Sequence, residues 1–154
     1  MSRYFSYINS SKKILDGYDG SQPFHLYLKK QFSANKNFGS RDRKTISAIC
    51  YAWLRTSHLF SRSLQDNNLL QAIFLCSRED NPVLEALAPE LNARITSTEI
   101  EKLQQLQFNP SQIFPFEKQL GAIDPAAFST SFLIQPLLFI RTRPGKKDKV
   151  AARL

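Results

Sequence analysis

Four side chains that could bind a polyanion recur within residues 39–55, at spacings close to whole helical turns. They are Arg41, Lys44, Tyr51 and Arg55. If this stretch is a helix, all four lie on its outward side, because residues three, four and seven positions apart share a face. Cationic groups hold phosphates and an aromatic ring can stack on a base. The spacing therefore predicts an outward face suited to a polyanion.

Residue types that carry catalysis are sparse by comparison. Cys50 and Cys76 each fall on an apolar helical face, without CxxC spacing or a histidine nearby in sequence. We interpret them as buried free thiols, as expected of a reducing compartment such as the cytoplasm. His25 and His58 are isolated, so we expect no metal site. No paired carboxylates and no Ser-His-Asp or Cys-His set are evident, so we assign no catalytic residue and no cofactor-binding residue.

The helix that must carry the cationic face has a clear start and a clear inner side. Ser40 is the expected N-cap, and Asp42 suits the positive end of the helix dipole. Arg43 lies at the edge of the apolar arc, where we expect it to pair with a carboxylate or with helix-end carbonyls. The arc that should be buried comprises Ile46, Ile49, Cys50, Trp53 and Leu54.

Composition favours an all-α fold. The chain has 154 residues, enough for one domain with a real core, and its 12 phenylalanines supply core material. Its five glycines are too few for a barrel or sandwich rich in tight turns. No secretory signal and no apolar run near 18 residues is present, so we expect neither secretion nor a membrane span.

The net charge of +8 is distributed unevenly along the sequence. Residues 1–62 carry a net charge of +8, residues 63–135 carry −5, and residues 136–154 carry +5. Clustered cations of this kind are typical of a surface that faces a polyanion. The alternative is a solvated surface whose charge is merely uneven.

Helical patterns account for most of the remaining sequence. The expected helices cover residues 3–16, 21–35, 58–64, 67–77, 81–87, 98–107 and 124–135, with a packed loop at 109–120. The expected N-caps of these helices include Ser21, Asn67, Asn81 and Asp124. Thr98 should begin a capping box. The residues expected to face inward include Ile100, Leu103, Phe128 and Phe132.

The pattern changes after Pro136. Residues 137–143 are apolar and β-prone, which predicts a strand, and residues 146–154 predict a basic turn leading into a helix. We therefore expect a helical domain at residues 1–135, and at 136–154 the start of a small α/β domain that continues beyond this sequence. The cationic residues Arg141, Arg143, Lys146 and Lys147 complete our set of candidate contacts.

Two motifs support a resemblance to a known family. Asp42-Arg43, followed by an apolar helix ending Tyr51-Ala52-Trp53-Leu54-Arg55, resembles the NusB-like N-terminal domain of bacterial RNA cytosine-5 methyltransferases of the RsmB/Sun family. Residues 139–144 resemble that family's strand of the form aromatic-Ile-Arg-x-Asn-x, with Arg143 in place of the asparagine. The resemblance implies a NusB-like helical bundle, followed by the first strand and helix of a small α/β linker domain.

The resemblance also implies a function. The full-length protein would transfer a methyl group from S-adenosylmethionine to C5 of a cytosine in rRNA or tRNA. Its Gly-rich cofactor loop and two catalytic cysteines would lie in a downstream catalytic domain. Neither Cys50 nor Cys76 has the Thr-Cys or Pro-Cys context of that catalytic pair.

Two functional hypotheses follow. The first is an RNA-docking domain that presents structured RNA to the catalytic domain, with the eight candidate contacts as RNA-binding residues. The alternative is a NusB-like protein-protein interaction domain whose basic patch meets an acidic partner.

Overall fold

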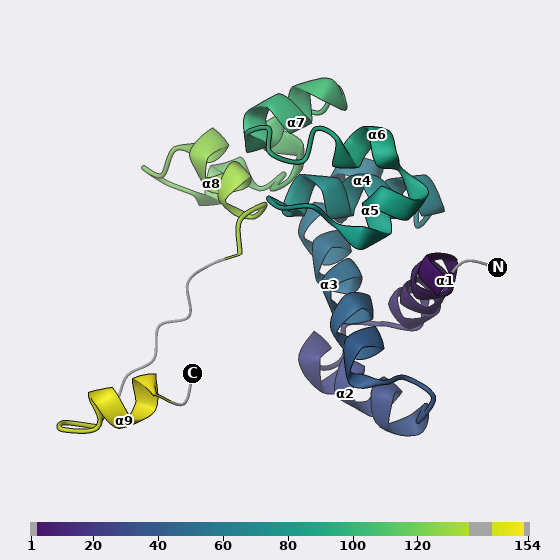
Figure 1. Ribbon diagram of the computed structural model, residues 1–154. Helices are drawn as coiled ribbons and strands as arrows, with labels where there is room; N and C mark the ends of the chain where they lie inside the picture. The colour runs from purple at the N-terminus through teal and green to yellow at the C-terminus, as the bar shows by residue number, and fades with distance from the viewer. Residues whose placement is uncertain (1–2, 136–142, 153–154) are drawn as a thin grey trace.

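The computed structural model describes residues 3–135 and 143–152 (Figure 1). Every regular element within these two ranges is helical, which confirms the all-α prediction for this part of the chain. Most of the strand expected at 137–143 lies outside the described residues, as does the expected domain boundary at 136. None of the described helices is long and apolar enough to cross a lipid bilayer.

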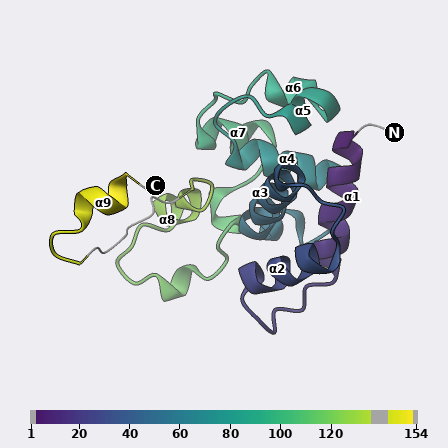
Figure 2. The same ribbon diagram turned by 60° about the horizontal axis from the view of Figure 1, so that its bottom comes forward.

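Helix α3 (Ser40–Thr56) runs through the middle of the fold. Its most extensive contacts are with α1 (Arg3–Asp16) and α4 (Asp66–Cys76). Figures 1 and 2 show α1, α4 and α2 (Phe24–Ala34) arranged around it. The helix that carries the predicted cationic face is therefore also central in space.

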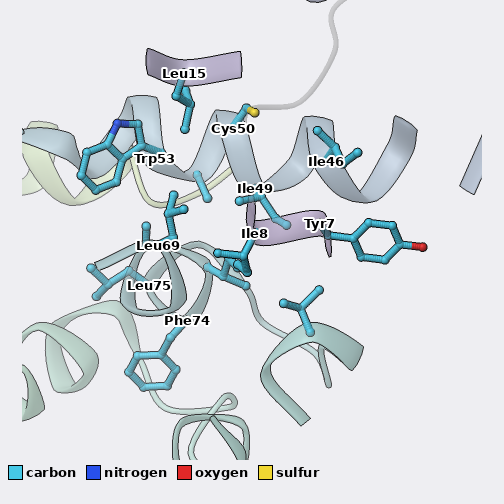
Figure 3. Close-up of a cluster of buried hydrophobic side chains, with 14 of the residues drawn as sticks. Tyr7, Ile8, Leu15, Ile46, Ile49, Cys50, Trp53, Leu69, Phe74 and Leu75 are labelled. Atoms are coloured by element: carbon cyan, nitrogen blue, oxygen red, sulfur yellow. The ribbon is translucent and has the colours of Figure 1, made fainter. Parts of the chain in front are cut away.

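The core forms where the apolar side of α3 meets α1 and α4 (Figure 3). Ile46 and Cys50 are completely buried, and Ile49 and Trp53 are nearly so, as predicted. Trp53 stacks on Phe60 of the 3-10 turn η1 (Ser57–Phe60), with 5.6 Å between ring centroids. Helix α4 contributes the fully or almost fully buried side chains of Leu69, Phe74 and Leu75, which confirms its prediction as a core helix.

The prediction that Leu54 belongs to the buried arc is wrong. Its side chain is 36% exposed, because α1 and α4 cover the arc from Ile46 to Trp53 and leave its far edge open. Periodicity places Leu54 near the arc but cannot say how wide a strip the neighbouring helices cover.

Three predicted N-caps are also corrected. Gly39, not Ser40, is the N-cap of α3, and its N–H donates to the Asp42 carboxylate at 2.9 Å. Helix α2 begins after Pro23, while Ser21 bonds to Asp19 instead.

The third correction concerns α4, which begins one residue before Asn67, with Gln65 as its N-cap. Asp66 in its first turn pairs with Lys12 of α1 at 2.6 Å. This contact between two helices is invisible to local sequence pattern.

The caps predicted in the second half of the chain are confirmed. Asn81 caps α5 (Pro82–Leu87), and Asp124 caps α8 (Pro125–Ser131). Thr98 caps α7 (Glu99–Gln105), with Glu101 completing the capping box. Between α5 and α7 lies the single-turn helix α6 (Pro89–Asn92).

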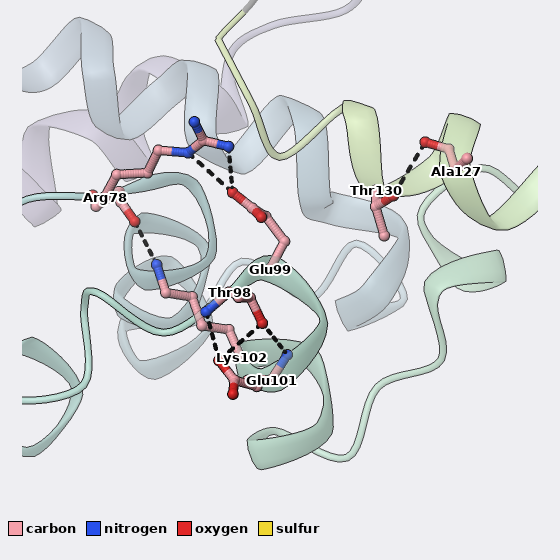
Figure 4. A network of polar contacts seen from close by, with 8 residues as sticks. Arg78, Thr98, Glu99, Glu101, Lys102, Ala127 and Thr130 are labelled. Atoms are coloured by element: carbon pink, nitrogen blue, oxygen red, sulfur yellow. Dashed lines mark hydrogen bonds and ion pairs between the residues drawn. The ribbon is translucent and has the colours of Figure 1, made fainter.

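The inner face of α7 differs from the prediction. Leu103 is buried as expected, but Ile100 is 56% exposed and Lys102 is buried in its place. The Lys102 ammonium donates to the carbonyl of Ser77 at the end of α4 and lies 5.1 Å from the centroid of the Phe74 ring. Figure 4 shows this contact beside the pair between Arg78 and Glu99. Burial lowers the pKa of Lys102.

The predicted loop at 109–120 contains two 3-10 turns, η2 (Pro110–Gln112) and η3 (Glu117–Gln119). Phe114 there contacts Phe128 and Phe132 around α8, at centroid distances of 5.1 and 5.9 Å. Phe132, expected to face inward, remains 36% exposed because only this small cluster covers it. The expected C-terminal helix is present as α9 (Lys147–Ala151).

Replacing a buried isoleucine and an exposed isoleucine by alanine should show which of the two side chains belongs to the core. Ile46→Ala should lower the free energy of unfolding by about 2–5 kcal/mol, because it leaves a cavity between α3 and its neighbours. Ile100→Ala is the matched control and should change it by less than about 0.5 kcal/mol, because its side chain is exposed. Urea denaturation followed by circular dichroism would measure both. Equal losses of stability would contradict the burial of Ile46 and the correction at Ile100.

Candidate nucleic-acid interface

A groove with a volume of about 650 Å³ runs along α3. The N-terminal turns of α1, the end of α4 and the start of α5 line it together with α3. Gln135, which follows α8 in the chain, also lines it. The helix with the predicted cationic face therefore borders a concave surface.

The four candidate residues of α3 all line this groove. Arg41, Lys44, Tyr51 and Arg55 lie along one stripe of the helix, as their spacing predicts. The structure thus brings together half of the predicted contact set on one surface. This stripe of α3 is not simply solvated, because residues of α1 and α5 line the same groove.

Arg3 of α1 is a fourth cation in the groove, and the sequence pattern did not indicate it. Its guanidinium donates to the hydroxyl of Tyr7 at 2.5 Å and lies 3.5 Å from the Asp42 carboxylate. The Tyr7 hydroxyl in turn donates to Asp42 at 2.6 Å. Figure 3 shows the Tyr7 ring at the edge of the core with its hydroxyl directed away from the apolar cluster. This network joins the N-terminal ends of α1 and α3.

The network shifts the acidity of its members. The hydrogen bond from Tyr7 and the backbone N–H of Gly39 hold the pKa of Asp42 below its ordinary value, since both stabilise the carboxylate. Burial raises the pKa of Tyr7, so this phenol stays protonated and able to donate. Asp42 and Tyr7 lie 35 residues apart in sequence, so no local pattern could have indicated their contact.

The groove is positively charged. Among the described residues that line it there are four cations, Arg3, Arg41, Lys44 and Arg55, and no Asp or Glu. Arg43 is directed elsewhere, because its guanidinium donates to the carbonyl of Phe38 and lies 5.9 Å from the ring centroid of Phe32. Arg43 is therefore a structural arginine, as predicted, but its partner is the carbonyl of Phe38 in the loop before α3 and not a carboxylate or a helix-end carbonyl.

Tyr51 and Arg55 each contact a side chain from another part of the chain. The ring of Tyr51 is 37% exposed and meets Phe24 edge to face, with 5.4 Å between centroids. Arg55 donates to the side-chain oxygen of Gln135 and lies close enough to the Cys76 thiol to act on its pKa. Both side chains therefore have defined positions while keeping surface open to a ligand.

Of the other predicted contacts, Arg143 and Lys146 are not among the described residues that line the groove. Arg143 and Lys146 are exposed in the segment that leads into α9. Arg141 lies outside the described residues, and of Lys147 only the backbone at the start of α9 is described.

The two cysteines are poor nucleophiles. Burial raises the pKa of Cys50 to about 12 and that of Cys76 to about 11. Cys76 lines the groove, and the adjacent Arg55 offsets only a small part of the effect of burial. Both thiols are free, as predicted. Within the described ranges, no group of three or more His, Cys, Asp or Glu side chains could hold a metal ion.

No protein-family model, curated protein or solved structure matches this chain. The residues of the groove are therefore the basis for assigning its chemistry.

Thiol labelling should report the burial of the two cysteines. At about pH 7.5 we expect iodoacetamide to alkylate the folded protein far more slowly than the protein in guanidinium chloride, because little thiolate is present. Cys76 should react before Cys50, since it is partly exposed and has the lower pKa. Peptide mass spectrometry would follow each site, and rapid labelling of Cys50 in the folded protein would contradict this description.

The Asp42 network should stabilise the fold only while Asp42 is ionised. The pKa of Asp42 lies below its ordinary value of 3.8 in the folded protein, so the unfolded chain binds more protons as the pH falls through this region. The stabilisation is thus complete above about pH 5 and is lost at lower pH.

Asp42→Asn is the test of this linkage, because asparagine can still accept the N–H of Gly39. We expect the unmodified protein to melt above the variant at about pH 6, and the difference in Tm to shrink between about pH 5 and about pH 2.5. A difference that stays constant over this range would show that the charge of Asp42 contributes nothing.

Proposed function

We propose that this chain is an RNA-docking helical region whose binding surface is the groove along α3. The observation that carries the proposal is the convergence of four cations on a concave surface without an acidic side chain among its described lining residues. Phosphate neutralisation by clustered cations drives association with nucleic acid. The net charge of +8 adds long-range attraction.

The arrangement within the groove also suits RNA better than a simple anion. Arg41 and Lys44 lie toward one end of the helical stripe and Arg55 at the other, with Tyr51 between Lys44 and Arg55. Cations spaced in this way hold successive phosphates, and an exposed aromatic ring offers a base a surface to stack on.

We further propose, from the motif resemblance alone, that the region serves an S-adenosylmethionine-dependent RNA cytosine-5 methyltransferase of the cytoplasm. Within that proposal residues 1–135 form a NusB-like bundle and 136–154 begin an α/β linker domain. S-adenosylmethionine would bind to a downstream catalytic domain, and this chain would orient rRNA or tRNA toward it. The raised pKa values of Cys50 and Cys76 are in keeping with a non-catalytic role.

A second candidate function is protein docking, which a separate surface favours. Around α8 and the turn η3, the side chains of Phe116, Ile123, Phe132 and Ile134 are each at least 36% exposed. Apolar side chains exposed at a surface are a common feature of protein contacts. A pull-down that persists after nuclease treatment, from a protein with no measurable RNA affinity, would favour this function.

Reversing charges in the groove should show whether RNA binds there or is attracted only by the net positive charge of the protein. We expect Lys44→Glu with Arg55→Glu to weaken binding to a fluorescein-labelled RNA hairpin by about tenfold or more, because two attractive phosphate interactions become repulsive. The slope of log K against log salt should fall by about one for each phosphate that is no longer neutralised. Fluorescence anisotropy at several salt concentrations would measure both quantities.

The matched control is Arg94→Glu with Lys118→Glu, which changes the net charge equally at exposed residues outside the groove. It should weaken binding much less than the groove pair. Equal weakening in the two double variants would reduce the binding to non-specific attraction, and unchanged affinity in the groove variant would overturn the proposal.

A further inference from the structure

We propose that the groove along α3 selects an unpaired RNA strand and receives one of its bases on an apolar floor. This inference rests on the proposed function and names the form of RNA that the same site takes. The floor of the groove supports it, whereas the cations around the floor support RNA binding in general.

We use the word floor for four apolar residues that line the groove: Ala48 and Ala52 of α3, Ile73 of α4 and Val83 of α5. Ala52, Ile73 and Val83 are buried, and Ala48 is exposed. The volume of about 650 Å³ is within the range of pockets that enclose small organic ligands. A nucleobase is a flat group of that size, with apolar faces that could lie on the floor and a polar edge that Thr45, Ser77 or Asn81 of the same groove could meet.

A duplex cannot use this floor. In an A-form helix the bases are stacked inside, and the surface offers phosphates and 2′-hydroxyls across a shallow minor groove. Such a surface would touch the cations and leave the apolar floor covered but unfilled. An unpaired strand can turn a base inward, and it gains both the phosphate contacts and the burial of the base.

The spacing of the side chains matches a short strand. From Arg41 to Arg55 the helix rises about 21 Å, which corresponds to the shorter single-strand sites of about four nucleotides. Between Lys44 and Arg55 the residues of α3 that line the groove are uncharged, and Tyr51 has the largest side chain among them. Phosphates would be held at the two ends, with a base between them beside the Tyr51 ring.

Filling the floor without changing any charge tests the inference. Ala48 is an exposed helical residue, so Ala48→Phe should fold, and Ala48→Leu provides a smaller second variant. The control is Ala126→Phe, at an exposed alanine of α8 outside the groove. Circular dichroism and Tm would establish that all three variants are folded.

The probes are a short labelled single-stranded RNA, roughly three times the length of one site, and the same RNA annealed to its complement. Fluorescence anisotropy at one salt concentration would measure both affinities. We expect the folded unmodified protein to bind the single strand at least about tenfold more tightly than the duplex, the scale of one stacked base. Ala48→Phe should remove most of this preference, Ala48→Leu part of it, and Ala126→Phe none.

Equal affinity for strand and duplex, or a preference unchanged by Ala48→Phe, would overturn the inference while leaving RNA binding intact. Displacement of the strand by cytidine monophosphate at the same nucleotide concentration would also overturn it, because the site would then be one for free nucleotides. Absence of binding to either RNA would instead contradict the proposed function, and with it the inference.

Discussion

The structure depends on the burial of one side of α3 between α1 and α4. Ile46 and Cys50 are fully buried there, and each large apolar side chain removed from water contributes about 1.5–3 kcal/mol. The same packing determines the groove, because the helices that cover the apolar side of α3 also rise beside its cationic side. A single helix therefore lies at the centre of the core through one set of residues and lines the candidate site through a largely different set.

The groove gathers positive charge that opposes folding. Arg3, Arg41, Lys44 and Arg55 repel one another, and within the described part of the chain no acidic side chain lines the groove to relieve them. Arg3 has a carboxylate partner, in the network with Tyr7 and Asp42. The apolar core must offset the remaining repulsion. Clusters of like charge that lower the stability of a protein are typical of binding sites, where an anionic ligand neutralises them.

A buried lysine holds the end of α4 that lines the groove. Lys102 lays its apolar stem against the core and donates from its ammonium group to the end of α4, over the face of Phe74. The nearby pair between Arg78 and Glu99 joins the same two segments. These contacts join α7 to the end of α4, and α4 in turn packs against α3, so that the part of the groove formed by the end of α4 is supported from behind.

Much of the helical framework could be predicted from the sequence, because its signals are local. The spacing of Arg41, Lys44, Tyr51 and Arg55 determined that they would share one side of α3, and the pairs Asn81-Pro82 and Asp124-Pro125 determined where two helices begin. Such features depend on bond geometry and hydrogen bonding within a few residues. By contrast, only the tertiary structure decided that Arg3 joins the groove, that Tyr7 meets Asp42, and that Lys102 rather than Ile100 is buried. Each of these outcomes depends on which distant helix covers a given side chain. Periodicity shows that a face is apolar or cationic, but burial and partners arise only when whole helices pack together.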